Sequence, residues 1–137
     1  MTVSWKPAQP YIPGRTLRPA EGAFDDLKCG LNDIPVERLT ETRAWVAGLA
    51  FFRDGYYWEA HEVLETVWLA CPPNAPERLM VQAIIQRANA ELKRVMGQER
   101  AALRLFDLSD KLACEAVERA GRSVLGFNAE LRIKVHD

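Results

Sequence analysis

The prolines of this chain decide which of its segments can form helices. Residues 71–76 read CPPNAP, and successive prolines cannot continue a helix because each lacks an amide donor and fixes its φ angle. Four more prolines and two glycines fall within residues 1–24. We therefore expect residues 1–24 to form a proline-rich, extended arm, and residues 25–137 to form a helical domain. Tyr11, Ile12 and Leu17 would anchor the arm along the domain; the alternative is a disordered tail.

Apolar residues recur at helical spacing on both sides of the break at residues 71–76. A first main helix is predicted from Pro35, with Asn32 or Asp33 as its N-terminal cap, to the turn at residues 54–55. A second helix is predicted over residues 56–70.

Two further helices are predicted in the second half of the chain. One begins near Pro76 and ends before Gly97, and the other spans residues 98–120 with Gly121 as its stop. Apolar and polar residues alternate over residues 131–135, which could form a short strand but have no evident partner strand. The sequence thus predicts an all-α, single-domain bundle of about four main helices, on which the N- and C-terminal arms pack.

Composition and charge exclude several classes of partner. The 137 residues carry a formal net charge of -1, which makes nucleic acid an improbable partner. No uncharged apolar run approaches ~18 residues, so no membrane segment is expected, and no apolar signal segment begins the chain. A small-molecule substrate and a homo-oligomer remain open as partners.

The cysteines indicate a reducing compartment. Cys29, Cys71 and Cys114 are odd in number, widely spaced and without a CxxC pair, so neither a disulfide framework nor a zinc knuckle is expected. We expect a cytoplasmic protein, in which Cys71 and Cys114 are buried thiols.

The predicted helix over residues 56–70 carries the candidate chemistry. His61 and Glu65 are four residues apart, so their side chains converge on one side of the helix, with Glu62 further round. Trp58 and Leu69 fall on the same side, away from the core face, which indicates a helix buried on two sides. The carboxylates would then lie in a cleft, where a bound cation would reduce their mutual repulsion.

The pattern His61-Glu62-x-x-Glu65 resembles a metal-binding helix. In that scheme His61 and Glu65 hold a divalent metal, of which Zn, Mn and Fe suit the donors, and Glu62 is the general base. The alternative is a pair of carboxylates on a solvated helix face.

A polar stripe follows on the next predicted helix. Gln82, Gln86, Asn89 and Lys93 stand at i, i+4, i+7 and i+11. Amides and an ammonium are suitable donors to carboxylates, so we expect this stripe to face the side of the preceding helix that holds His61. The alternative is an ordinary polar boundary.

The same residues resemble a known family. Residues 51–68, FFRDGYYWEAHEVLETVW, are similar to the signature F-x-x-G-x-Y-x-E-A-H-E-x-x-E-x-x-W of the family catalogued as domain of unknown function 309. Residues 81–86, VQAIIQ, resemble its Q-G-L-I-Q element, with Ala83 in place of the glycine. Residues 11–16, YIPGRT, resemble an N-terminal segment of a proteobacterial-type subgroup. Many relatives have a histidine at Lys93, and a protonated lysine cannot bind a metal.

The resemblance implies an all-α fold and the label of metal-dependent hydrolase, a label that itself derives from the His/Glu pattern. The first hypothesis is therefore such a hydrolase, in which His61 and Glu65 bind the metal and Glu62 activates water. Its candidate substrate-binding residues are Trp58, Glu59, Trp68, Gln82, Gln86 and Lys93. The rival hypothesis is a non-catalytic helical binding module, similar to tetratricopeptide units, in which the same residues form a structural polar network; at most two imperfect units are visible.

Overall fold

Helices form every regular element in the part of the chain that the structure describes. The structure is a computed structural model, and it describes residues 6–31 and 34–135. Its elements are α1 (Asp25–Lys28), the 3-10 helix η1 (Val36–Glu41), α2 (Arg43–Arg53), α3 (Tyr57–Ala70), α4 (Pro76–Val95) and α5 (Glu99–Ala120). The all-α prediction is confirmed. Among the described helices, none combines the length and the apolar character needed to cross a membrane.

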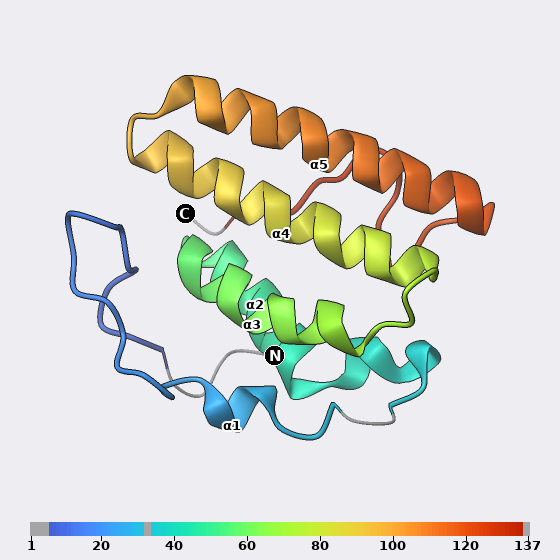
Figure 1. Ribbon diagram of the computed structural model, residues 1–137, viewed down its shortest axis with the longest axis horizontal. Helices are drawn as coiled ribbons and strands as arrows, with labels where there is room; N and C mark the ends of the chain where they lie inside the picture. The colour runs from blue at the N-terminus through green and yellow to red at the C-terminus, as the bar shows by residue number, and fades with distance from the viewer. Residues whose placement is uncertain (1–5, 32–33, 136–137) are drawn as a thin grey trace.

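Each main helix packs against the next one along the chain. Figure 1 shows α4 and α5 side by side as an antiparallel pair, with α2 and α3 forming a second layer beneath them. Fully buried side chains from α2, α3 and α4 make one continuous core, which includes Phe51, Leu64 and Ile84. Because α3 lies between α2 and α4, two of its sides are covered along most of its length, and its remaining sides can carry polar groups.

The first predicted helix is wrong in its extent. The chain forms η1 first, then becomes extended at Thr42, and only then begins α2 at Arg43. The Oγ1 atom of Thr42 accepts a hydrogen bond from the amide of Trp45 at 3.3 Å, which satisfies a free donor at the start of α2. The caps expected at Asn32 and Asp33 lie outside the described residues. The short helix α1 was not predicted.

The other three main helices begin and end within about a residue or two of their predicted limits. Pro76 occupies the first turn of α4, where its missing amide costs no hydrogen bond. Gly121 caps α5 in the left-handed region, with a φ angle of 68°. These ends follow from local chain chemistry, which is why the sequence locates them.

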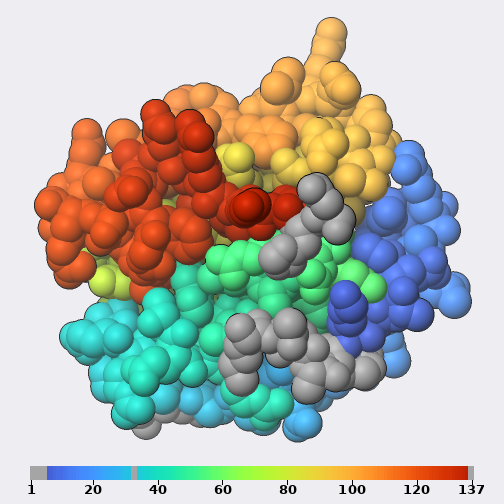
Figure 2. Space-filling view, turned by 180° about the vertical axis from the view of Figure 1, so that it is seen from behind, coloured from blue at the N-terminus to red at the C-terminus, as the bar shows by residue number. Residues whose placement is uncertain are grey.

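Both ends of the described chain pack on the bundle. In the N-terminal arm, the Tyr56 hydroxyl donates to the carbonyl of Pro7 at 2.7 Å, and Arg15 donates to the carbonyl of Val95 at 2.9 Å. Leu17 is 87% exposed, so the expectation that it anchors the arm is wrong. Figure 2 shows the C-terminal tail in red, lying between α5 in orange and the green and cyan of α2 and α3. Leu131 and Ile133 are buried, but residues 131–135 form no strand; the tail holds one isolated bridge between residues 124 and 127.

Of the two cysteines that were expected to be buried, one is buried and the other is exposed. Cys71 is buried, as predicted, and its thiol donates to the carbonyl of Val67 at 3.4 Å. Cys114 is exposed, so that prediction is wrong. The reason is that α5 is an outer helix that buries mainly small residues against its neighbours, such as Ala113 and Ala116, while Cys114 points away from them.

We expect Cys71 to resist alkylation in the folded protein. Burial, with a smaller contribution from the Glu77 carboxylate, raises the pKa of Cys71 to about 11 from an ordinary 9.0. Two pKa units reduce the reactive thiolate fraction about a hundredfold at pH 8. Peptide mapping after iodoacetamide treatment should show Cys29 and Cys114 modified first, and the unfolded protein modified at all three. Equal modification of the three thiols in the folded protein would contradict this environment.

Candidate functional site

His61, Glu62 and Glu65 lie together on one side of α3. Each offers one metal-binding atom, and these atoms all lie within 4.8 Å of one another. The Nε2 atom of His61 is 3.4 Å from the Oε2 atom of Glu65, and its Nδ1 atom is 4.0 Å from the Oε1 atom of Glu62. The side chains of His61 and Glu62 are 24% and 29% exposed and that of Glu65 is 52% exposed, so the cluster is half-buried and open to solvent on the side of Glu65.

A pocket of about 210 Å³ lies between this cluster and α4. His61, Glu65 and Trp68 line it from α3, and α4 contributes the rest of the lining: Gln82, Ile85, Gln86 and Asn89. The structure therefore brings three members of the predicted polar stripe against the His61 side of α3. Lys93, the fourth member, is half-buried near the end of α4 and does not line this pocket.

Two polar atoms of the pocket residues lack hydrogen-bond partners within the described residues. These are the Nδ1 atom of His61 and the indole Nε1 of Trp68, both of which are buried. The Trp68 ring is also covered by the guanidinium of Arg78, at 4.0 Å from the ring centroid. Buried polar atoms without partners are rare in folded proteins, and they mark a place where a ligand could supply the missing contact.

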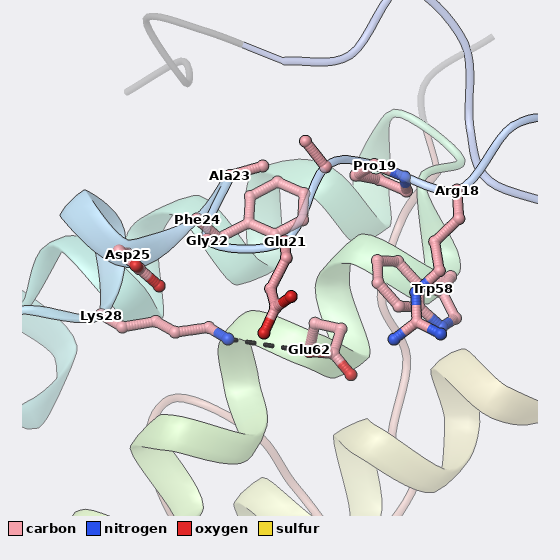
Figure 3. Close-up of a pocket in the computed structure, with 11 residues that line it drawn as sticks. Arg18, Pro19, Glu21, Gly22, Ala23, Phe24, Asp25, Lys28, Trp58 and Glu62 are labelled. Carbon is pink, nitrogen blue, oxygen red and sulfur yellow. Dashed lines mark ion pairs between the residues drawn. The ribbon is translucent and has the colours of Figure 1, made fainter.

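A second and larger pocket opens on the other side of Glu62. It has a volume of about 620 Å³ and lies between the N-terminal arm and α3 (Figure 3). The Nζ atom of Lys28 is 3.7 Å from the Oε2 atom of Glu62, and Arg18 reaches in from the arm. Sequence reasoning missed Arg18 and Lys28, because a proline-rich arm has no spacing rule that assigns its side chains to a neighbour.

Trp58 lines the larger pocket and is also the surface on which the arm packs. Its ring meets that of Tyr11 edge-on, with centroids 4.9 Å apart, and the guanidinium of Arg18 lies 5.4 Å from its centroid. Leu69, by contrast, is 65% exposed, so the expectation that both residues are covered is wrong for Leu69. The arm contacts α3 near its N-terminus, at Trp58 and Glu59, and Leu69 lies beyond these contacts.

Glu59 lies apart from the cluster and beneath the arm. Its side chain is fully buried, and its Oε2 atom accepts a hydrogen bond from the amide of Tyr11 at 2.8 Å. Its Oε1 atom has no partner among the described residues. Burial raises the pKa of the Glu59 carboxyl above its ordinary value of 4.5, and the amide of Tyr11 opposes this only in part.

The donor set of the cluster fits a divalent metal ion. One imidazole and two carboxylates are typical ligands of Zn, Mn and Fe. Two atoms that bind the same ion lie at most about 4.2 Å apart, since each bond is about 2.1 Å long. The 3.4 Å between His61 Nε2 and Glu65 Oε2 satisfies this limit, and the partnerless Nδ1 leaves the imidazole free to be oriented by a second group. Within residues 6–31 and 34–135, no other group of three such residues is this close together.

Comparison with known protein families gives a match for the middle of the chain. Residues 45–105 match the family model described as Domain of unknown function (DUF309). The matched segment runs from α2 into α5, so it contains the His61 cluster and the amides of α4 but not the N-terminal arm. No curated protein and no solved structure matches the chain.

Proposed function

Because residues 45–105 are a domain of the DUF309 family, whose description assigns no activity, we propose from the site itself that the protein is a metal-dependent hydrolase of a small polar substrate. The observation that carries this proposal is the placement of the His61 imidazole, the Glu65 carboxylate and three amides around one pocket, with the Glu62 carboxylate beside the imidazole. The candidate metal ligands His61 and Glu65 therefore line the same pocket as the amides that could bind a substrate.

Each member of the cluster has a distinct role in this proposal. His61 and Glu65 would hold the metal, because their facing atoms are 3.4 Å apart. A bound divalent ion supplies Lewis-acid polarisation of a carbonyl or phosphoryl oxygen. Glu62 would accept a proton from the attacking water, since it lies next to His61 and lines the larger pocket as well.

The pocket residues of α4 would orient the substrate. Gln82, Gln86 and Asn89 each offer two N–H donors and one carbonyl acceptor. The buried indole N–H of Trp68 adds a donor that has no partner in the described chain. Such fixed donors can select a substrate with oxygen acceptors, and they leave the carboxylates free for the metal.

We expect tag-free protein to bind one divalent metal ion, and we expect Glu65→Gln to weaken that binding at least tenfold. The variant keeps the shape of the side chain but removes the charge that attracts the ion. Calorimetric titration with Zn²⁺ and Mn²⁺ measures the affinity, and Glu118→Gln, at an exposed position on α5, is the matched control. Failure of both metals to bind the unmodified protein would overturn the proposal.

Glu62→Gln separates catalysis from metal binding. If Glu62 is the base, this variant retains most of the metal affinity but loses at least a hundredfold of the hydrolysis rate on a panel of p-nitrophenyl esters and phosphates. An unchanged rate would exclude Glu62 as the base.

One observation favours a second candidate, a non-catalytic module with a structural polar network. The imidazole of His61 lies between two carboxylates, and Glu62 is already paired with Lys28. In that case Glu62→Gln and Glu65→Gln should lower the melting temperature markedly while no metal binds. The hydrolase proposal expects small changes, because both carboxylates are partly exposed.

A further inference from the structure

The pocket between the N-terminal arm and α3 has walls that are far apart in the sequence. Residues 18–25 and Lys28 form one wall, and Trp58 and Glu62 form the other (Figure 3). Its volume of about 620 Å³ falls within the range of small-molecule sites, which is roughly 300–1,000 Å³. It adjoins the metal-binding candidates through Glu62, which belongs to both.

Arg18 supplies an unpaired positive charge to this pocket. Its guanidinium packs 5.4 Å from the centroid of the Trp58 ring, which restricts where the side chain can point. No carboxylate in the described part of the chain lies within ion-pair distance of it. A guanidinium held beside an aromatic ring at the edge of a pocket is well suited to a carboxylate, to which it can donate two parallel hydrogen bonds.

Glu21 supplies an unpaired negative charge to the same pocket. Figure 3 shows its carboxylate pointing toward Lys28 and Glu62, whereas Arg18 lies on the other side, next to Trp58. No described cation lies within ion-pair distance of Glu21, and Lys28 is paired with Glu62 instead. Asp25 adds a further carboxylate to this acidic side. The pocket therefore has a basic end and an acidic end, and its unpaired charges do not neutralise each other.

We propose that this pocket binds a small zwitterion, an amino acid or the end of a short peptide, with its carboxylate on Arg18 and its ammonium on Glu21. A simple anion would be attracted by Arg18 but repelled by Glu21 and Asp25. A simple cation would be attracted by Glu21 and Asp25 but repelled by Arg18. Only a ligand that carries both charges complements both ends. Phe24 and Trp58, whose ring centroids are 6.4 Å apart, add nonpolar lining that a hydrocarbon segment of the ligand can contact.

This ligand also specifies a substrate class for the adjoining cluster, and that step rests on the proposed hydrolase. A dipeptide would place its amide bond beside Glu62. Hydrolysis would add one water across the C–N bond and release a carboxylate and an amine. The binding site itself does not depend on this reaction.

The test uses three small probes that each contain an amide and carry different charges. Diglycine is zwitterionic, N-acetylglycine is an anion and glycinamide is a cation. We expect diglycine to bind the full chain about tenfold more tightly than either of the others, as measured by chemical-shift titration in metal-free buffer, with the shifts centred on the residues of the pocket. Equal binding of N-acetylglycine and diglycine, or no binding of diglycine, overturns the proposal.

Charge-neutral variants assign the two ends. Arg18→Gln should weaken diglycine binding about tenfold without weakening glycinamide binding, and Glu21→Gln should weaken diglycine binding without weakening N-acetylglycine binding. Arg104→Gln, an exposed arginine of α5, is the matched control and should change nothing. If Arg18→Gln leaves diglycine binding intact, the assignment of the carboxylate end is wrong.

The metal-free buffer separates this proposal from the hydrolase. Diglycine binding in the absence of metal supports the zwitterion site even if no metal ever binds the cluster. Metal binding without diglycine binding would support the metal site at His61 and Glu65, and it would exclude the pocket beneath the N-terminal arm as the substrate site.

Discussion

Replacing Gly48 with valine should lower the free energy of unfolding by about 3 kcal/mol, because α2 and α3 meet too closely at this point to admit a side chain. A Cβ atom at Gly48 would lie 2.5 Å from the Cδ2 atom and 2.6 Å from the Cγ atom of Leu64. Real carbon atoms do not approach this closely, so either Leu64 or the helix must move. Both residues are buried, which leaves little space for that movement.

Gly48→Ala should have a smaller effect of the same sign. Alanine introduces the same Cβ clash, but it also gains about 1 kcal/mol over glycine from its higher helix propensity. Thermal unfolding of the two variants should give a fall in melting temperature of about 10 °C for valine and a few degrees for alanine.

A double variant tests whether Leu64 is the cause. Leu64→Ala alone should cost about 2–5 kcal/mol through the cavity that it leaves. Combined with Gly48→Val, it should cost clearly less than the sum of the two single losses, because the valine fills part of that cavity. Strict additivity would show that the contact between Gly48 and Leu64 does not limit the packing of α2 on α3.

Glu59→Gln should stabilise the protein at pH 8 by about 1–3 kcal/mol, since it removes a buried charge whose second oxygen has no partner among the described residues. The amide oxygen of glutamine can still accept the hydrogen bond that the amide of Tyr11 donates to Glu59. The variant therefore keeps the anchor of the N-terminal arm while it removes the cost of desolvating a carboxylate.

The pH dependence follows from the direction of the pKa shift. Burial raises the pKa of Glu59 in the folded state above 4.5, so between the two values the folded protein holds more protons than the unfolded chain. The contribution of Glu59 to stability is therefore full below about pH 4.5, and it is lost as the pH rises through the raised value.

Urea unfolding of the wild type and of Glu59→Gln between pH 4 and pH 8 measures this effect. The difference in free energy of unfolding should grow in favour of the variant as the pH rises, and it should level off above the folded-state pKa. Glu118→Gln, at an exposed position, should show no such trend. A difference that stays constant with pH would mean that Glu59 is not desolvated in the folded protein.

The main helices could be predicted from the sequence because their limits are set by local chemistry. Pro76 and Gly121 fix an end of α4 and of α5 through backbone constraints that hold wherever the segment packs. Helical spacing likewise placed Gln82 and Gln86 on one stripe of α4, and the structure shows both in the pocket with His61. The relation between residues on one helix is thus readable from spacing alone.

Local sequence patterns did not predict the segment before α2, where a 3-10 helix forms in place of an α-helix. Pro35 was expected in the first turn of one long helix, but the chain forms a 3-10 helix over Val36–Glu41 and begins α2 only after the side-chain cap at Thr42. The exposures of Cys114 and Leu69 were also wrong, because an apolar position on a helix is buried only where another segment covers it.

The sequence by itself determined the presence and order of the four main helices and the grouping of His61, Glu62 and Glu65 on one side of α3. Only the tertiary structure decided that the N-terminal arm passes over Trp58, buries Glu59 and brings Arg18 and Lys28 to the pocket beside Glu62. The physical reason is that helical periodicity relates residues a few positions apart, whereas the path of an arm without periodic structure depends on contacts between residues about 40 to 80 positions apart, such as the hydrogen bond from Arg15 to Val95.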